Sequence, residues 1–392
     1  MHSHQWAYKA FPVRQAYQVE PPKKPKESHP GADQTNMAFI QLYREKLHAN
    51  YHHLEQMFAA QGIDWAVVSK MLCGHRAYLE ELIGLGIRSV CDSRISNLAT
   101  IKDIDPTVET IYIKPPAKRS ISDIVRHADV SFNTERYTIE LLSAEAQRQG
   151  KVHRVIIMIE LGDLREGIMG SHLMDFYASV FQLPHIEVAG IGANLNCLNG
   201  VLPSEDKLIQ MSLYEQLIEA KFNVSIPWVS GGTSVIIPLL LRGQVPTGIN
   251  HFRVGEALFF GNNLLTDEPL EGMHTDVIKL FAEVIEVTEK PRIPIGYLGE
   301  NPSGEAFHVD EADYGKSSFR AILDVGLLDV DASFLIPDDD ALKVFGASSD
   351  MLVLDLGDQR ERYRVGDLVS FRLKYMGALS LLNSDYIGKE VV

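Results

Sequence analysis

The chain has 392 residues, of which 45% are apolar and 23% charged, and its formal net charge is −15. A chain of this length can bury a large core, and its ordinary apolar content argues against a disordered or fibrous protein. The negative charge argues against a nucleic-acid surface, because binding to phosphates needs clustered Lys and Arg.

Residues 1–37 carry five prolines and a single basic cluster, KKPK at 23–26, which predicts an N-terminal extension rather than a folded domain. This segment lacks the apolar stretch of a secretory signal, and no apolar run in the chain reaches the roughly 20 residues of a membrane span. The three cysteines form no CxxC pair, which argues for reduced thiols and against a zinc site. We expect a cytoplasmic protein with no membrane partner, no nucleic-acid partner and no bound metal.

From residue 38 onward, apolar β-branched runs alternate with amphipathic helical segments, a pattern typical of βαβ units and a parallel sheet. Eight such units favour an α/β fold with a (β/α)8 TIM-type barrel over residues 38–262, and the main alternative is a doubly wound open sheet. The predicted strands are 64–70, 89–92, 110–114, 129–132, 155–161, 187–194, 227–230 and 250–253.

After the barrel the sequence changes in character. From about residue 275 the helical periodicity fades, and apolar runs at 276–287, 318–327, 350–357 and 363–375 are separated by Gly, Pro and Asp. Such runs are typical of strands joined by turns. The sequence therefore predicts a C-terminal, mostly-β domain over residues 263–392.

Lys70 ends the first predicted strand, in the run DWAVVSK. Burying an unpaired ammonium group there would cost several kcal/mol, so either the side chain extends to water or its amine does chemistry. In a (β/α)8 barrel, reactive groups stand at the carboxyl ends of the strands, and the loops after strands seven and eight commonly hold phosphate. We expect Lys70 to stand in this mouth, where desolvation would keep its amine nucleophilic.

The loops after the seventh and eighth predicted strands have the composition of an anion site. In SGGTS, glycines let backbone N–H groups approach an anion and hydroxyls can cap the next helix; Gly255 in RVGE presents another amide. The residues concerned are Ser230, Gly232, Thr233, Ser234 and Gly255. A turn of this kind can also be no more than a helix cap. Together with a lysine at the same mouth, however, it suggests pyridoxal 5'-phosphate, which needs an amine and a phosphate cradle.

Several motifs carry a family resemblance. AVVSKMLCGH at 66–75 resembles the lysine segment of the fold-type III pyridoxal phosphate enzymes, the alanine racemase class, and VHRVIIMIELGDLREGI at 152–168 is most similar to the ornithine racemase group. In the second domain, GASSDMLVLDL at 346–356 and YRVGDLVSF at 363–371 resemble the racemase pattern. The resemblance covers residues 38–392. It implies a racemase that interconverts L- and D-amino acids, with ornithine or a related basic amino acid favoured.

The resemblance also implies roles for single residues. Lys70 looks like the Schiff-base lysine and one of two proton-transfer bases at Cα, and Tyr297 looks like the second catalytic base. In the family this tyrosine reaches the site of the other subunit, which implies a homodimer with shared sites. Arg165 resembles the arginine that binds the substrate carboxylate, with Ser348 and Ser349 touching it from the partner. A surface salt bridge for Arg165 and a half-buried strand position for Tyr297 are the plainer interpretations.

Around the cofactor, Arg253 resembles the arginine that faces the pyridine nitrogen, although Glu256 lies close enough in sequence to take that place. Two residues depart from the alanine racemase pattern: Asn194 stands where a ring-contacting histidine is usual, and Met158 where a lysine often lies behind the carboxylate-binding arginine. The further cofactor contacts that the resemblance implies are Thr233, Ser234, Gly255 and Tyr386.

Because Met158 replaces that lysine, we expect Glu160 or Asp163 to hold Arg165, and either carboxylate could also pair with the distal ammonium group of a basic substrate. Two other functions remain open. One is a decarboxylase or lyase on the same scaffold, although residues 340–392 contain neither the His nor the Cys that a metal-dependent lyase would need. The other is a non-catalytic protein that binds pyridoxal phosphate, for which the second domain has no evident use.

Overall fold

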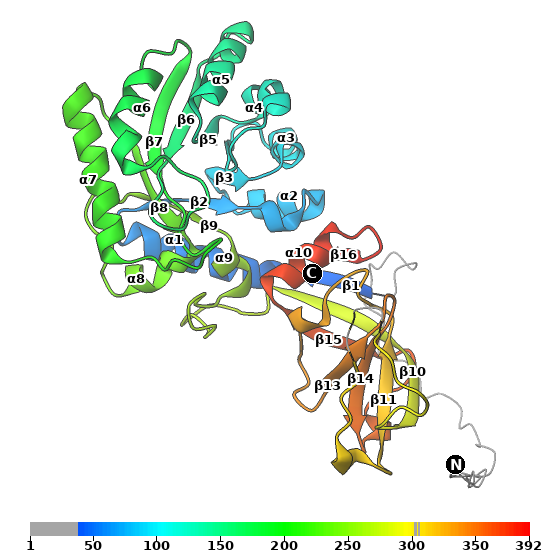
Figure 1. The fold of residues 1–392 in the computed structure, drawn as a ribbon. Coiled ribbons are helices and arrows are strands. Elements are labelled where there is room, and N and C mark those ends of the chain that lie inside the picture. The colour runs from blue at the N-terminus through cyan, green and yellow to red at the C-terminus, as the bar shows by residue number, and fades with distance from the viewer. Residues whose placement is uncertain (1–37, 302–303, 305) are drawn as a thin grey trace, which may run out of the picture.

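The computed structural model describes residues 38–301, 304 and 306–392. The extension predicted over residues 1–37, with its basic cluster, lies outside the described residues. Figure 1 shows a barrel surrounded by helices and, beside it, a separate mostly-β body that contains the long strand β10 (Ile278–Pro291).

The first body is a closed barrel of eight parallel strands, in the order β2 to β9. The barrel closes because β2 pairs with β9, from Asp64 opposite His251 to Val67 opposite Val254, which rules out the open doubly wound sheet. Each predicted strand is confirmed to within a few residues. The strands are β2 (Asp64–Val68), β3 (Ser89–Asp92), β4 (Glu109–Tyr112), β5 (Val130–Asn133), β6 (His153–Met158), β7 (Ile186–Gly192), β8 (Trp228–Thr233) and β9 (His251–Val254).

Helices cover the outside of the barrel, and apolar side chains such as Val68, Phe132, Ile156 and Met158 fill its inside. The barrel is therefore a packed core, and a ligand must bind above it. The helices are α1 (Arg44–Ala59), α2 (Arg76–Gly84), α3 (Ile95–Ile104), α4 (Ile121–His127), α5 (Arg136–Arg148), α6 (Leu173–Val180), α7 (Glu205–Phe222), α8 (Ile237–Leu241) and α9 (Glu256–Phe260).

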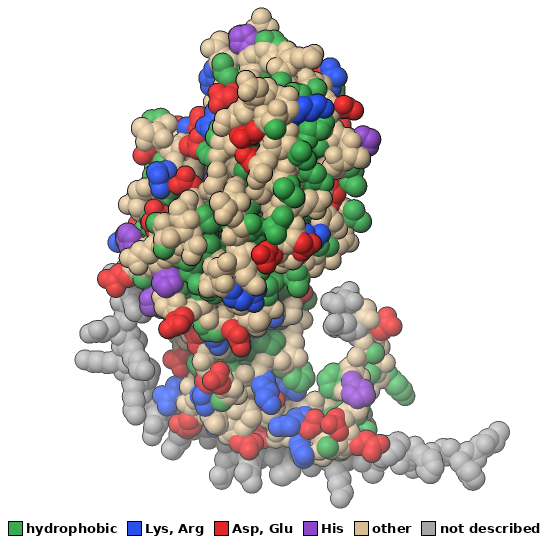
Figure 2. Space-filling model, turned by 90° about the vertical axis from the view of Figure 1, so that its left-hand side faces the viewer, with side chains coloured by type: hydrophobic (Ala, Val, Ile, Leu, Met, Phe, Trp, Pro, Cys, Tyr) green, Lys and Arg blue, Asp and Glu red, His purple; other side chains and the backbone are tan. Residues whose placement is uncertain are grey.

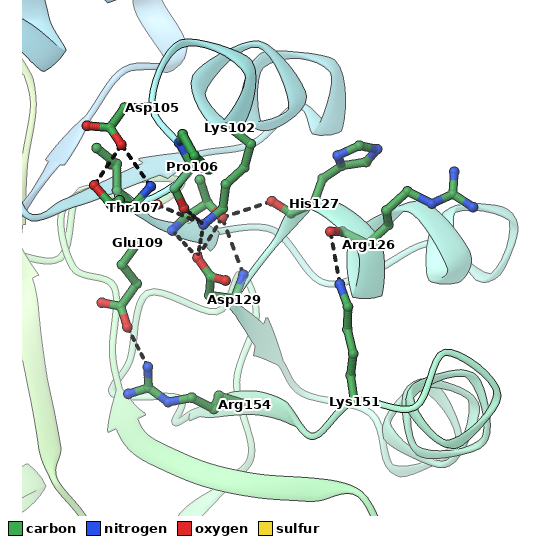
Figure 3. A network of polar contacts seen from close by, with 12 residues as sticks. Lys102, Asp105, Pro106, Thr107, Glu109, Arg126, His127, Asp129, Lys151 and Arg154 are labelled. Carbon is green, nitrogen blue, oxygen red and sulfur yellow. Dashed lines mark hydrogen bonds and ion pairs between the residues drawn. The ribbon is translucent and has the colours of Figure 1, made fainter.

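At the amino-terminal ends of β4 to β6, a polar network closes the barrel (Figure 3). Lys102 Nζ pairs with Asp129 at 2.6 Å, and Lys151 Nζ donates to the last carbonyl groups of α4. Arg154 pairs with Glu109 and also lies over the Trp228 ring. All three cations have partners, so this end of the barrel contributes stability rather than a reactive site.

The second body is an antiparallel sheet in the order β12, β15, β10, β11, β14, β13. Strands β10, β11 (Ser317–Leu323), β14 (Leu352–Gly357) and β15 (Leu368–Leu373) confirm the four predicted runs. The sequence missed three further strands, which are β12 (Leu335–Pro337), β13 (Lys343–Ala347) and β16 (Gly388–Val391).

The same sheet includes the first described strand, β1 (Ala38–Leu42), which runs antiparallel to β10 and parallel to β16. The sequence analysis placed residues 38–42 in the barrel, whereas the structure places them in the second sheet. Both ends of the described chain therefore meet in the second body, and the barrel is inserted between β1 and β10.

One helix of the second body touches the mouth of the barrel. Helix α10 (Tyr375–Asn383) packs against the short 3-10 helix η1 (Lys70–Leu72), which directly follows β2. Its start falls within the run that the sequence predicted to be a strand, so the prediction was wrong for Tyr375. This contact gives the second body a direct place beside Lys70.

Figure 2 views the molecule from the side on which α7 lies in Figure 1, and hydrophobic side chains gather on the barrel part of this face. On α7 itself, Leu208 and Met211 are buried while Ile209, Leu213 and Leu217 are exposed, so this helix is apolar on two faces. In the part of the chain that the structure describes, no helix is both long and apolar enough to cross a membrane.

Candidate active site

A cavity of about 740 Å³ opens at the carboxyl ends of the barrel strands, within the usual size range of sites for small ligands. Loops that follow β2, β4, β6, β7, β8 and β9 line it, together with the first residue of α10. It brings together eight of the predicted site residues, namely Lys70, Arg165, Asn194, Thr233, Ser234, Arg253, Gly255 and Glu256.

Lys70 stands at the start of η1, two residues after β2 ends at Val68. Because the strand ends early, the lysine leaves the apolar run and reaches the cavity, where it is exposed. The desolvation expected from the sequence is therefore absent in the open cavity. The Lys70 Nζ lies 6.0 Å from the centroid of the Tyr375 ring, and the amine remains accessible to a ligand.

The segment that the sequence predicted as an anion-binding turn, Ser230 to Ser234, forms the end of β8 and the start of a 3-10 helix, without a side-chain cap on that helix. The Ser234 Oγ accepts hydrogen bonds from the backbone N–H groups of Gly255 at 3.3 Å and Ala257 at 3.2 Å. A Cβ atom on Gly255 would lie only 2.9 Å from the Val68 carbonyl oxygen, so this position accepts only glycine without a shift of the backbone. Because the Ser234 Oγ is the acceptor in both bonds, its hydroxyl proton remains available to a ligand in the cavity.

Arg253 lies in the floor of the cavity and is 2% exposed. Its Nη1 donates to the Ser230 Oγ at 2.5 Å, and its Nη2 donates to the Ala193 carbonyl and the Asn194 Oδ1, both at 2.7 Å. The guanidinium group also lies over the Phe132 ring, 5.1 Å from its centroid. Burial lowers the pKa of Arg253 to about 10, which still leaves it charged at neutral pH.

Ser230 acts below the cavity rather than in it. Its Oγ accepts from Arg253 and also forms a hydrogen bond with the His251 Nδ1 at 2.8 Å. Burial, and then the nearby Arg253, lower the pKa of His251 to about 3, so the ring stays neutral. Ser230 was predicted as a cofactor contact. In the structure it holds Arg253, and neither Ser230 nor Gly232 lines the cavity.

Arg165 is held by Glu166, which the sequence suggested, with Asp163, only as the partner of a surface salt bridge. Its Nε and Nη2 both donate to the carboxylate of Glu166, which also accepts from the Asn194 Nδ2 at 2.5 Å. Since the Asn194 Oδ1 accepts from Arg253, Glu166 and Asn194 connect the two arginines of the cavity. Glu166 and Asn194 therefore hold Arg165 in this chain, where Met158 replaces the lysine that the family resemblance led us to expect behind it.

The expectation that Glu160 or Asp163 holds Arg165 was wrong. The Asp163 carboxylate accepts backbone N–H groups from four residues of the loop after β7, the shortest being 2.8 Å from Leu198. Glu160 accepts from the backbone of Gly162 and Leu164. Both carboxylates are committed to folding these two loops, so neither is placed to bind a distal ammonium group.

Glu256 lines the cavity next to Lys70 and has no hydrogen-bond donor among the described side chains or backbone groups. Burial raises the pKa of Glu256 to about 6, Lys70 opposes this rise, and Asp267 adds to it. The Glu256 carboxylate is thus near enough to Lys70 for the two charges to interact, whereas Arg253 lies buried in the floor of the cavity.

Tyr375 is a cavity residue that the sequence analysis missed. It lines the cavity from α10, and its hydroxyl is buried without a partner among the described residues. Burial raises its pKa, so the group is a neutral phenol that can donate a hydrogen bond. No local signal in the sequence could reveal this contact, because it depends on how the second body packs against η1. Asn262 and Asp267, on the loop after α9, also line the cavity and were missed.

Four predicted residues lie away from the cavity of the single chain. Tyr297, Ser348 and Ser349 are exposed on the second body, and Tyr386 is 82% exposed in the turn before β16. The turn holds Tyr386 outward, since its backbone N–H bonds to the Ser384 Oγ at 3.2 Å. Tyr386 is therefore not placed as a cofactor contact in one chain. The other three were expected to act on the site of a partner, which stays a prediction.

Comparison with known proteins adds to this geometry. The family described as alanine racemase, N-terminal domain, matches residues 43–263. An ornithine racemase of Acetoanaerobium sticklandii is 36% identical over 348 residues, which is 88% of this chain and 97% of that protein. A lysine racemase of Thermotoga maritima is 31% identical over 348 residues, covering 88% of this chain and 96% of that protein.

Among solved structures, the alanine racemase of Bartonella henselae with covalently bound pyridoxal phosphate has the same fold, with a TM-score of 0.69. The match covers 91% of this chain and 99% of that one at 17% sequence identity. At this identity the comparison supports the architecture of a barrel with a second β body.

Proposed function

Because the chain belongs to the alanine racemase N-terminal domain family, we propose that it is a pyridoxal 5'-phosphate-dependent racemase that interconverts the L and D forms of a basic amino acid. One observation carries the proposal. Lys70, Arg165 and Arg253 enter a single cavity at the carboxyl end of the barrel, from three different strand ends. An amine, a carboxylate-binding group and a ring-facing cation are thus within one site.

The fit to the cofactor rests on hydroxyl, amide and amine groups at the cavity wall. The hydroxyls of Thr233 and Ser234 and the amide of Gly255 would hold its phosphate, and Lys70 would hold it covalently. The buried Tyr375 hydroxyl lacks an acceptor among the described residues, which an anionic ligand would supply. When bound, the cofactor supplies a ring that withdraws electrons from Cα and makes its proton acidic.

Arg253, rather than Glu256, is the better candidate for the group at the ring nitrogen. Its Nη1 and Nη2 are used by the protein, while its Nε has no acceptor among the described residues. A guanidinium group can only donate, so it favours a ring nitrogen without a proton. Such a ring withdraws electrons less strongly, which favours return of a proton to Cα over the reactions of a decarboxylase.

The substrate proposal rests on Arg165 and on the relatives. Arg165 carries the planar guanidinium group that matches a carboxylate. Its Nε and Nη2 donate to Glu166 and its Nη1 to the Cys197 Sγ at 2.5 Å, so a substrate carboxylate would take the place of one of these acceptors. The relatives at 36% and 31% identity are named for ornithine and lysine. A basic amino acid is therefore favoured over alanine.

Racemisation needs two groups that take and return a proton on opposite faces of Cα. Lys70 serves one face. For the other we propose Tyr297 of a second copy, in a homodimer with shared sites. The exposure of Tyr297, beside the exposed Ile295 and Leu298, supports a partner that covers this segment.

The test is reduction of the purified protein with borohydride followed by peptide mapping, together with chiral chromatography of ornithine and lysine. We expect pyridoxyl label on Lys70, and formation of both enantiomers from either pure one. Lys70→Ala should remove the label and the activity. Lys114→Ala is a matched control, because Lys114 also lines the cavity and should keep the label on Lys70. Label on another lysine, or a labelled protein that racemises no amino acid, would refute the proposal.

A further inference from the structure

We infer that Asp267, oriented by Asn262, binds the distal ammonium group of the substrate and thereby selects basic amino acids. The inference rests on the proposed function and names the specificity residue of the same site. Asp267 and Asn262 lie on the loop that joins α9 to β10, and both line the cavity that holds Lys70.

The loop is folded so that it presents the carboxylate. Its two ends are joined by the hydrogen bond from the Leu270 N–H to the Gly261 carbonyl at 2.8 Å, and the Asp267 N–H donates to the Asn263 carbonyl at 2.8 Å. Asp267 adopts a φ of 60°, a left-handed conformation that aspartate tolerates better than most residues. The Asn262 Nδ2 donates to the Asp267 Oδ1 at 2.8 Å.

This hydrogen bond fixes the direction of the Asn262 amide. A carboxylate only accepts, so the nitrogen of the amide must face Asp267 and its oxygen must face away. The Asn262 Oδ1 is buried and receives no hydrogen bond from any described residue. A buried acceptor in this state is unfavourable until a donor arrives. An ammonium group has three donors and could serve this oxygen and the Asp267 carboxylate together.

The charges of the cavity wall agree with this role. Three carboxylates line the cavity, and only Glu166 forms an ion pair with a described residue, Arg165. Glu256 and Asp267 act on each other as like charges, since Asp267 raises the pKa of Glu256. Lys114, a further cation of the lining, makes no ion pair with either. An ammonium group near Asp267 would relieve this repulsion.

Three alternative acceptors are already used, and the fourth, Glu256, lies beside Lys70 at the reacting centre. Glu160 and Asp163, which the sequence suggested, bind backbone amides, and Glu166 binds Arg165 and Asn194. With the substrate carboxylate on Arg165 and its reacting centre at Lys70, the loop after α9 is the part of the lining that still offers an unused carboxylate at the rim. A diamino acid would thus be bound at its carboxylate and at its distal ammonium group, whereas an amino acid with an uncharged side chain would be bound only at its carboxylate.

The test compares each charged substrate with its analogue lacking the distal amine, on the cofactor-loaded protein. The quantity is the ratio of kcat/KM for L-ornithine to that for L-norvaline. We expect Asp267→Asn to lower this ratio about tenfold or more, because the site at the rim is partly open to water. Asp267→Glu keeps the charge and should retain much of the ratio. Glu268→Gln is the matched control, since it removes the same charge from an exposed neighbour outside the cavity lining and should leave the ratio unchanged.

A binding measurement separates this inference from the proposed reaction. The probes are 2-methylornithine and 2-methylnorvaline, which carry no proton on Cα and cannot be racemised. Calorimetry should show tighter binding of 2-methylornithine to the unaltered protein, by about tenfold, and loss of this preference in Asp267→Asn. Equal binding of the two probes, or a preference that Asp267→Asn retains, would overturn the role of Asp267. A protein that shows the preference but racemises nothing would refute the proposed reaction alone.

Discussion

At the scale of single residues, the cavity is defined by which charges have partners. Arg165 and Glu166 neutralise each other, and Arg253 is surrounded by neutral acceptors on the barrel floor. Glu256 has neither an ion-pair partner nor a hydrogen-bond donor among the described residues. Besides burial, the charges of Lys70 and Asp267 shift its pKa. A carboxyl group in this position changes its protonation state near physiological pH.

This leads to a prediction for Glu256→Gln. Because the folded protein raises the pKa of Glu256 from its ordinary value of 4.5 to about 6, it binds that proton more tightly than the unfolded chain does. Protonation of Glu256 therefore stabilises the folded protein fully below pH 4.5, and this stabilisation is lost as the pH rises through 6. At pH 7.5 the variant should unfold with a free energy about 1–2 kcal/mol larger than the unaltered protein.

Urea unfolding of the cofactor-free protein at several pH values checks this. The difference between Glu256→Gln and the unaltered protein should shrink towards zero by pH 4.5. Glu271→Gln, which changes an exposed carboxyl, should show no difference at any pH. A Glu256→Gln protein that is less stable at pH 7.5 would mean that Lys70 outweighs burial at this site.

Sequence reasoning found the residues that lie in compact motifs and missed those that come from distant segments. Lys70, Arg165, Arg253 and Ser234 stand at the carboxyl ends of strands or in the loops that follow them, where the barrel architecture itself predicts the position of reactive groups. Tyr375 reaches the cavity only because α10 packs on η1. That packing depends on contacts between two bodies, which no local pattern encodes.

At the scale of elements, the join between β9 and α9 shapes the proposed phosphate site. Gly255 is pressed against the end of β2, and its amide lies in the same small region as the Ser234 hydroxyl. A side chain here would force β2 and β9 apart at the mouth, beside Lys70. A glycine is therefore needed at position 255 because the backbone there lies close to the end of β2. Its backbone conformation is one that other residues can adopt.

We predict that Gly255→Val lowers the free energy of unfolding by roughly 1–3 kcal/mol, because the new side chain overlaps the Val68 carbonyl and its Cβ. The variant should also release the cofactor more readily. Thermal unfolding and the dissociation constant for pyridoxal phosphate measure the two effects. Gly84→Ala, at the end of α2, is the control, because a Cβ there meets nothing within 4 Å. Equal cofactor affinity in Gly255→Val would remove this glycine from the cradle.

The strands that the sequence predicted correctly are those whose own amino-acid composition is enough to indicate a strand. All eight barrel strands and four strands of the second sheet are apolar runs bounded by turns. The missed strands β1, β12, β13 and β16 have 3 to 5 residues each and are stabilised by their neighbours in the sheet. Pairing of that kind depends on partners far along the chain, so local propensity does not show it.

At the scale of the whole molecule, the cavity of one chain contains one candidate base, while the expected second base is fully exposed on the other body. A shared site would explain both facts. The exposed positions at Tyr297, Ser348 and Ser349 would then lie against the barrel mouth of a second copy.

We therefore predict that activity depends on concentration, with specific activity falling in parallel with the dimer fraction measured by sedimentation. Tyr297→Phe should bind the cofactor normally but lower kcat roughly 100-fold in at least one direction, the range expected for loss of a general acid or base. Tyr314→Phe is the matched control, since Tyr314 is another exposed tyrosine of the second body. A monomer with full activity, or unchanged rates in Tyr297→Phe, would show that one chain completes the reaction alone.

The placement of β1 in the second sheet has a consequence for biosynthesis. Phe39 lies opposite Phe281 on one side and Gly388 on the other, so the first described strand depends on β10, which is made after the barrel, and on β16, which leaves the ribosome almost last. At about 5–20 residues per second, the barrel can form while β1 still has both edges open for some tens of seconds. A nascent chain of this protein thus carries an unsatisfied β edge through most of its translation, and chaperones that shield such edges would act at its amino-terminal side.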